Sequence, residues 1–140
     1  VGAHESGLIG EDPNGIPNNL MPFLLKVAVG EFRELKVFGN NYPTSDGTGK
    51  RDYIHVMDVV EGHVSALNWI FAQDKSKNIC REFNLGTGNS VSVLELIENF
   101  VQLTGFDINY SVVDRRAGDI AESYADPSRA NLELNWKNLN

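Results

Sequence analysis

The sequence predicts an α/β fold, in which short strands alternate with amphipathic helices. Stretches with apolar residues at helical spacing are followed by short runs rich in β-branched and aromatic residues, and this order recurs along the 140 residues. That length is enough for one ordinary domain. The predicted strands are too few and too scattered for a complete doubly wound sheet, so we expect only part of such a fold.

The first predicted elements lead to a long loop. Residues 4–19 are rich in Gly, Pro, Asn and acidic residues and are predicted to form an irregular but ordered loop. A helix is predicted from about Asn19 to Glu31, because apolar residues recur there at helical spacing. Residues 35–38 are predicted to form a short strand. Residues 39–51 are predicted to form a long polar loop, and loops of this length in compact domains are often functional.

A second helix and further strands follow. Residues 51–54 are predicted to form a strand that leads into the helix. The apolar positions of this helix repeat at four-three-four-three spacing and are therefore predicted to face the core. They are Val56, Val60, His63, Leu67 and Ile70, with His63 as a hydrogen-bonded core histidine. Residues 82–85 are predicted to form a buried strand, and residues 108–113 alternate like a strand.

Two later helices carry start signals. Ser92 and Glu95 have the spacing of a capping box at the beginning of an amphipathic helix. Asp126 and Pro127 offer an N-cap and a first-turn proline for a last short helix, which is predicted to end near Trp136.

Composition argues against several classes of protein. The formal net charge is −7, whereas a nucleic-acid-binding protein normally carries a basic face. No stretch approaches the roughly 18 apolar residues of a membrane-spanning helix. Cys80 is the only cysteine, so no disulfide can form within the chain. We expect a plain structural role for Cys80 and a reducing compartment, the cytoplasm.

Two patterns that suggest a cofactor or a metal are incomplete. Gly86-Thr87-Gly88 starts like a dinucleotide-binding fingerprint, but the third glycine is missing. We therefore expect an ordinary turn there rather than a pyrophosphate site. His55 and His63 are separated by about 12 Å of helix rise, and no cluster of Cys or acidic residues completes a metal site around them or around His4.

Two arginine-containing segments suggest an anion site. The first is the run from Asp46 to Val56, in which Arg51 follows a glycine-rich loop, and the second is Arg115-Arg116-Ala-Gly-Asp119. Arginine suits phosphate because its planar fork donates two parallel hydrogen bonds. Considered by themselves, these residues leave both anion binding and surface ion pairing open.

Taken together, the ordered motifs resemble the UDP-galactose 4-epimerases (UDP-glucose 4-epimerases) of the extended short-chain dehydrogenase/reductase family. The matching segments are Gly-Ala-His-Glu-Ser-Gly at 2–7, the run from Gly10 to Pro22, Phe38-Gly-Asn, the run from Asp46 to Asp58, Asn84-Leu-Gly-Thr-Gly and Arg115-Arg-Ala-Gly-Asp. The resemblance spans essentially the whole chain. It implies the C-terminal, UDP-sugar-binding portion of such an enzyme over residues 1–140, including elements that complete the Rossmann domain.

The family's catalytic half is expected to be missing from this chain. In the family that half binds NAD through a three-glycine motif and carries a Tyr-x-x-x-Lys pair. The four tyrosines here are followed four places on by Asp46, Met57, Asp114 and Ser128, never by lysine. We therefore expect no catalytic residue and no NAD site in the chain, and no activity from it alone. NAD is expected on the missing N-terminal half, which would be a partner of this chain in a parent that could be a homodimer.

The resemblance also implies substrate-binding residues. Asn19 and Leu20 are expected near the UDP pyrophosphate at a helix start. Lys36, Val37 and Phe38 are expected to meet the uracil, partly through backbone groups. Arg51 and Arg116 correspond to the two pyrophosphate arginines, Asp119 to the acceptor for the ribose hydroxyls, and Ser123 to the position that limits the hexose pocket.

In the whole enzyme the resemblance implies inversion at C4 of a UDP-hexose through a 4-keto sugar that turns about its pyrophosphate. Two alternatives remain open. Related family members dehydrate or decarboxylate nucleotide sugars with the same binding half, and the fragment could also be a UDP-sugar-binding module without catalysis.

Overall fold

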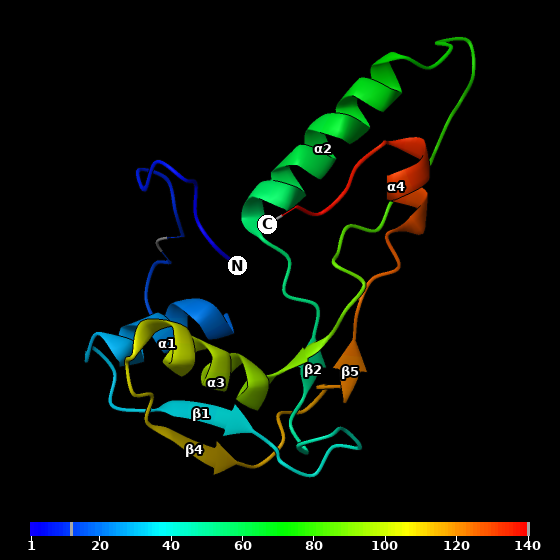
Figure 1. Cartoon of the computed structure of the whole chain (residues 1–140). Helices are drawn as coiled ribbons and strands as arrows, with labels where there is room; N and C mark the ends of the chain where they lie inside the picture. The colour runs from blue at the N-terminus through cyan, green and yellow to red at the C-terminus, as the bar shows by residue number, and fades with distance from the viewer. Residues whose placement is uncertain (12, 140) are drawn as a thin grey trace. The chain divides into compact units, whose positions relative to one another are not determined.

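The computed structural model describes residues 1–11 and 13–139, so Asp12, within the 10–22 motif, lies outside the described part. The elements follow in the order α1 (Leu20–Ala28), β1 (Leu35–Phe38), β2 (Lys50–Arg51), α2 (Val56–Phe71), β3 (Val91–Ser92), α3 (Val93–Thr104), β4 (Tyr110–Val113), β5 (Glu122–Ser123) and α4 (Ser128–Glu133) (Figure 1). They form two compact units. The strand unit comprises Glu11–Arg51 and Ser90–Ser123, and the helical unit comprises Val1–Gly10, Asp52–Asn89 and Tyr124–Asn140.

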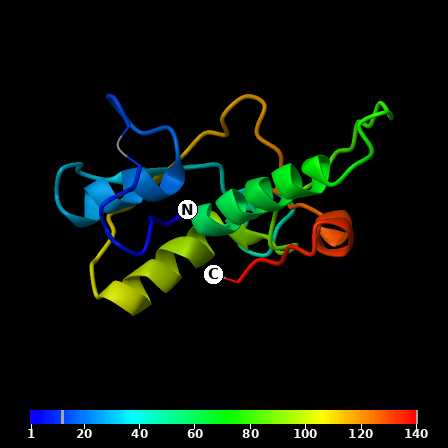
Figure 2. The same cartoon turned by 90° about the horizontal axis from the view of Figure 1, so that it is seen from above.

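The strand unit is built on a parallel pair of strands. β1 pairs with β4 in a register that runs from Leu35 opposite Tyr110 to Phe38 opposite Val113. Helices α1 and α3 lie together over one face of this pair (Figures 1 and 2). The buried core between them consists of Leu24, Val27, Leu35, Val37, Ile97 and Ile108. The apolar stripe of α1 and the buried face of β1 therefore meet in one core.

Alternation along β1 decides which side chains remain outside this core. Leu35 and Val37 are buried, whereas Lys36 and Phe38 are exposed. Because parallel strands point the same way, β1 and β4 end at the same edge. The loops over residues 39–49 and 114–121 both begin at that edge, so two segments far apart in sequence come together there.

A smaller sheet lies in the same unit. β2 pairs antiparallel with β3 and parallel with β5. β3 continues directly into α3, whose first turn is closed by the predicted capping box: the Ser92 hydroxyl accepts from the Glu95 amide and the Glu95 carboxylate accepts from the Ser92 amide, each at 3.0 Å. Gly105 ends the helix in the left-handed conformation.

The helical unit has its own small core around α4. Ala130, Leu134 and Trp136 are buried, and five partly buried side chains pack against them: Ile54, Ala66, Trp69, Phe83 and Leu85. The Trp136 indole donates from Nε1 to the backbone carbonyl of Asp58 at 2.8 Å, which fixes the segment after α4 to the first turn of α2.

Helix α2 forms where it is predicted, but the face that it buries is not the apolar stripe that was predicted to face the core. Asp58 and Gly62 are its buried residues. A Cβ at Gly62 would lie 2.5 Å from Leu85 Cδ1, so only glycine allows this close approach. The apolar stripe predicted for the core is exposed: Val60 is 47% exposed, Leu67 52% and Ile70 58%. His63 on this stripe is exposed too and contacts the Val59 carbonyl, so its predicted core position is wrong.

Two predicted strands are shortened or absent. The strand over 51–54 is restricted to Lys50–Arg51. Residues 82–85 form no strand, although Phe83 and Leu85 pack inward in alternation. A ladder needs a neighbouring backbone, and within the described ranges none pairs with this segment.

The remaining differences lie at helix ends and at the cysteine. α1 ends at Ala28, before the predicted Glu31. α4 begins at Ser128, with Pro127 at the N-cap, and ends at Glu133, before Trp136. Cys80 is exposed, so it takes no place in a core. None of the helices in the described part of the chain has both the length and the hydropathy to cross a membrane.

Candidate functional site

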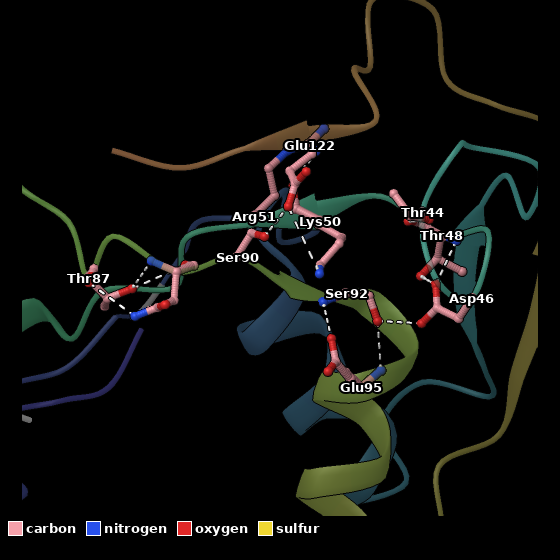
Figure 3. A network of polar contacts seen from close by, with 11 residues as sticks. Thr44, Asp46, Thr48, Lys50, Arg51, Thr87, Ser90, Ser92, Glu95 and Glu122 are labelled. Atoms are coloured by element: carbon pink, nitrogen blue, oxygen red, sulfur yellow. Dashed lines mark hydrogen bonds and ion pairs between the residues drawn. The ribbon is translucent and has the colours of Figure 1, made fainter. Parts of the chain in front are cut away.

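The loop after β1 is held by a carboxylate rather than shaped by glycines alone. Asp46 Oδ1 accepts from the amide and the hydroxyl of Thr48, both at 2.8 Å. Asp46 Oδ2 accepts from the hydroxyl of Ser92, the residue that caps α3 (Figure 3). Thr48 and Ser92 are fully buried. The loop is therefore fastened to the start of α3, and this fixes the strand that follows it, β2.

The same hydrogen bonds affect the acidity of Asp46. Burial acts to raise the pKa of Asp46, but the hydrogen bonds from Ser92 and Thr48 outweigh it and hold the pKa below its ordinary value. The carboxylate is thus charged over the whole neutral range. Gly47 completes the turn with φ +80, where a Cβ would lie 2.1 Å from the Asn40 carbonyl oxygen.

Arg51, Arg116 and Asp119 form the charged centre of the strand unit. Arg51 Nη1 donates to the carbonyls of Lys50 at 2.8 Å and Ile120 at 2.9 Å, which anchors its guanidinium at the ends of β2 and the segment before β5. Asp119 Oδ1 lies 3.0 Å from Arg116 Nη2 and 3.7 Å from Arg51 Nη2. Two arginines thus share one carboxylate oxygen.

This arrangement leaves a local excess of positive charge in an acidic chain. Hydrogen bonding to Asp119, with its negative charge, raises the pKa of Arg116. The Arg116 side chain is 60% exposed, so its ion pair is weak and readily exchanged. Two guanidinium groups that share one carboxylate can accept a further anion, and their planar forks suit phosphate oxygens.

Two further predicted residues lie close to this centre. The Arg116 guanidinium lies 5.5 Å from the centroid of the Phe38 ring, at the end of β1. Ser123 is the Cα partner of Arg51 in the β2–β5 register, and its side chain is exposed. The structure therefore brings together Phe38, Arg51, Arg116, Asp119 and Ser123, which come from distant parts of the sequence.

The other four predicted residues have different surroundings. Asn19 is the N-cap of α1, but its side chain does not cap the helix and donates instead to Glu11 Oε1 at 3.2 Å. Leu20 packs against the core of the strand unit. Lys36 is exposed. The Val37 side chain is 1% exposed within the core, so only its backbone is available to a ligand.

The two consecutive arginines, of which only Arg116 is expected to bind the pyrophosphate, have different partners in the structure. Arg115 turns toward the loop after β1, where its Nε donates to Asn41 Oδ1 at 2.6 Å and its guanidinium lies 3.9 Å from the centroid of the Tyr42 ring. Tyr42 was not predicted as a site residue. Its position after Phe38-Gly-Asn, beside the polar loop, is the only signal in the sequence that could have pointed to it.

The glycine turn in the helical unit is occupied by a protein carboxylate. Asp52 accepts from the Thr87 amide at 3.0 Å, the Thr87 hydroxyl at 2.6 Å and the Gly88 amide at 3.2 Å. The donors that a cofactor pyrophosphate would need are thus already used. Together with the missing third glycine, this means that the residues present do not fit an NAD pyrophosphate site at Gly86–Gly88.

No group of three or more His, Cys, Asp or Glu side chains within residues 1–11 and 13–139 is arranged to hold a metal ion.

The mixed α/β fold matches the C-terminal part of extended short-chain dehydrogenase structures. The family described as GDP-mannose 4,6-dehydratase matches residues 2–139, and the chain belongs to this family, with the extended short-chain dehydrogenase fold.

Among the proteins similar to this chain are UDP-glucose 4-epimerases. The chain is 54% identical over 136 residues to the UDP-glucose 4-epimerase of Bacillus subtilis, which covers 97% of this chain. The crystal structure of UDP-glucose 4-epimerase from Stenotrophomonas maltophila, with bound NAD and formylated UDP-arabinopyranose, matches the whole chain with a TM-score of 0.92 and 53% identity. The enzyme from Bifidobacterium longum, in complex with NAD+ and UDP, matches 100% of the chain with the same TM-score of 0.92 and 52% identity.

The chain spans only part of these relatives. It covers 39% of the Bacillus subtilis protein and 40% of each of the two solved chains.

Proposed function

We propose that this chain is the UDP-hexose-binding part of a UDP-glucose 4-epimerase. The observation that carries the proposal is the pair of guanidinium groups of Arg51 and Arg116 around Asp119, at an edge where two parallel strands end. The similar enzymes supply the substrate class, since one of them was crystallised with UDP and another with a UDP-pentose.

Each residue of the centre has a role that fits its surroundings. Arg51 and Arg116 bind the diphosphate as charge-assisted donors. Asp119 then gives up part of its ion pairing and accepts hydrogen bonds from the hydroxyls of the ribose. The uracil lies along β1, where the exposed Lys36 and Phe38 and the backbone at Val37 are available. Asn19 and Leu20 present the amino end of α1 to the diphosphate. Ser123 borders the hexose.

The arrangement suits inversion at C4 of the hexose, a reaction in which the sugar must present both of its faces to the reacting groups. Tight contacts to the nucleotide and diphosphate hold the hexose close to the reacting groups, while a small residue such as Ser123 leaves the ring free to turn. NAD, bound to the part of the protein that this chain does not span, supplies the hydride chemistry at C4. This chain contributes binding and orientation, and we expect it to be inactive by itself.

A dehydratase remains the second candidate, because the matching family is described by that activity. Relatives above half identity over nearly the whole chain are epimerases, which favours the first proposal. Incubation of the full-length protein with UDP-galactose separates the two: UDP-glucose is the product expected of an epimerase, and a 4-keto-6-deoxy sugar that of a dehydratase.

The arginine roles are tested by UDP affinity in the full-length protein. Arg51→Ala or Arg116→Ala removes a charge-assisted contact of about 1.5–3 kcal/mol, so titration calorimetry should show a roughly ten- to hundredfold weaker Kd for UDP. Lysine at either position should restore affinity only in part, because a point charge cannot reproduce the fork. Arg33→Ala, at an exposed site in the same unit, is the matched control. An unchanged Kd in Arg51→Ala would indicate that Arg51 forms surface ion pairs and does not bind the diphosphate.

A further inference from the structure

Tyr42 and Arg115 form an aromatic–cation stack next to the proposed diphosphate site. Arg115 Cζ lies 3.9 Å from the centroid of the Tyr42 ring, and Tyr42 is only 6% exposed. Arg115 Nε donates to Asn41 Oδ1 at 2.6 Å, and Arg115 Nη2 donates to the Asn41 carbonyl. The segment after β4 is therefore joined to the loop after β1 by one ring face and two hydrogen bonds.

The backbone around the stack leaves no spare room. Gly39 has φ +83, and a Cβ there would lie 2.6 Å from Arg115 Cγ and 2.9 Å from Tyr42 Cε2. The Tyr42 amide donates to the Gly47 carbonyl at 2.9 Å, and the Gly39 amide donates to the Val113 carbonyl at 2.8 Å. Both ends of the stack are thus fixed to the main chain.

The stack also separates two neighbouring arginines. Arg115 is committed to Asn41 and Tyr42, so it is not free to bind an anion with its whole fork. Arg116, one residue later, contacts Asp119 at 3.0 Å. A flexible arginine on an exposed loop would lose conformational entropy when it bound a ligand, and prior ordering of its backbone lowers that cost.

We propose that the Tyr42–Arg115 stack is a positioning device that fixes the turn carrying Arg116 and Asp119, and thereby holds Arg116 at the separation from Arg51 that a nucleoside diphosphate requires. This inference rests on the proposed function. Tyr42 acts through Arg116, and it is the Tyr42 ring rather than its hydroxyl that does so.

The first test measures UDP affinity by calorimetry in the full-length protein. Tyr42→Leu and Arg115→Gln each remove one side of the stack, and each should weaken UDP binding about three- to tenfold. Tyr42→Phe keeps the ring and should stay within about twofold of the original. Equal losses in Tyr42→Phe and Tyr42→Leu would show that the hydroxyl, not the stack, is what matters.

A matched control separates positioning from general destabilisation. The Phe32 ring lies in the same unit with Lys26 Nζ 5.7 Å from its centroid, and it packs against the core. Phe32→Leu should lower Tm without changing the Kd for UDP. A similar loss of UDP affinity in Phe32→Leu would overturn the inference. If Tyr42→Leu does not fold, Arg115→Gln provides the test, because Arg115 is exposed.

A double-mutant cycle tests whether the stack acts through Arg116. In an Arg116→Ala background, Tyr42→Leu should weaken UDP affinity clearly less than it does in the unaltered protein, since the main group that it positions is gone. Additive losses would contradict the inference. If the unaltered protein did not bind UDP, the proposed function itself would fail. If the protein bound UDP and both stack variants bound it equally well, only the positioning role would fail.

Discussion

Single carboxylates organise the irregular segments of this chain. Asp52 accepts hydrogen bonds from Thr87, Gly88 and Ala125, the last at 3.2 Å, and so joins three segments of the helical unit. Asp46 does the same for the loop after β1 through Thr48 and Ser92. Neither role is evident from composition or spacing, because Thr87 and Ala125 lie far from Asp52 in sequence, and Ser92 lies far from Asp46.

Asp52→Asn should destabilise the full-length protein by about 1–3 kcal/mol, because an amide cannot accept from all of the donors that now face the carboxylate. Urea unfolding measures the change. Asp74→Asn is the matched control, since the Asp74 carboxylate accepts from the amide and the hydroxyl of Ser76 in a local turn, and it should change stability little. A loss no larger than that of the control would show that Asp52 does not organise the unit.

Stability should also fall in acid. Burial acts to raise the pKa of Asp52, but hydrogen bonds from Thr87, Ala125 and Gly88 lower it below its ordinary value of 3.8, and the pKa of Asp46 is lowered too. A carboxyl with a lowered folded-state pKa contributes stability that is complete above its unfolded-state pKa. That contribution should persist down to about pH 5 and disappear as pH falls through and below 3.8. In Asp52→Asn this acid dependence should be reduced.

Ser123 is expected to decide the size of the accepted sugar. Its exposed side chain lies opposite Arg51 in the β2–β5 pairing, and serine leaves space beside the proposed hexose position. We expect the full-length protein to interconvert UDP-GlcNAc and UDP-GalNAc as well as the smaller pair. Ser123→Tyr should suppress the N-acetyl reaction selectively, because overpacking costs about 1–3 kcal/mol. Parallel rate measurements with both substrate pairs decide the matter, and equal effects on the two would refute the role of Ser123.

Among the elements, α3 links the core of the strand unit to the loop after β1. Ser92 closes the capping box and donates to Asp46, so one residue stabilises the helix start and the loop together. Ile97 on the same helix is buried against α1 and β1. The position of β2, and with it Arg51, therefore depends on how α3 begins.

Ser92→Ala should remove both contacts and lower the free energy of unfolding by about 1–2 kcal/mol. Ser92→Thr keeps a hydroxyl at the N-cap and should retain most of the stability. Chemical denaturation of the two variants gives the comparison. If alanine and threonine behaved alike, the hydroxyl of Ser92 would not be the stabilising group.

At the scale of the whole molecule, one long face of α2 is uncovered by the described residues of its own unit. Val56, Val60, Val64, Leu67 and Phe71 form an exposed apolar stripe on α2, with Phe71 73% exposed. The similar enzymes are longer, since the chain covers only 39–40% of them. We propose that this stripe packs against the N-terminal part of the full-length protein, and we expect the isolated chain to be marginally stable or prone to aggregation.

Leu67→Lys should therefore have opposite effects in the two contexts. In the full-length protein it places a charge in a buried contact and should lower Tm by several degrees. In the isolated chain it should improve solubility. Leu132, which is 84% exposed on α4, offers the control, and Leu132→Lys should leave Tm unchanged. A sharp, reversible and monomeric unfolding transition in the isolated chain would contradict the expectation of marginal stability.

Local signals predicted most of the elements correctly. The capping box of α3 and the helical spacing in α1 depend on neighbours within a few residues, and these helices begin where they were expected, as does the short strand β1. The α/β class and the family follow from the same order of elements and motifs. Residues 82–85 have the alternation of a strand, but strand pairing requires a second backbone that periodicity cannot supply.

Tertiary contacts decided the rest. The buried face of α2 is set by Gly62 against Leu85 and by Asp58 beneath Trp136, although its apolar spacing predicted the other face. Arg115 and Arg116 are adjacent residues of the same type, yet one stacks on Tyr42 and the other pairs with Asp119. Residue type and spacing determine which chemistry a segment can perform. Which groups meet depends on chain segments that are distant in sequence, and only the packed structure brings those together.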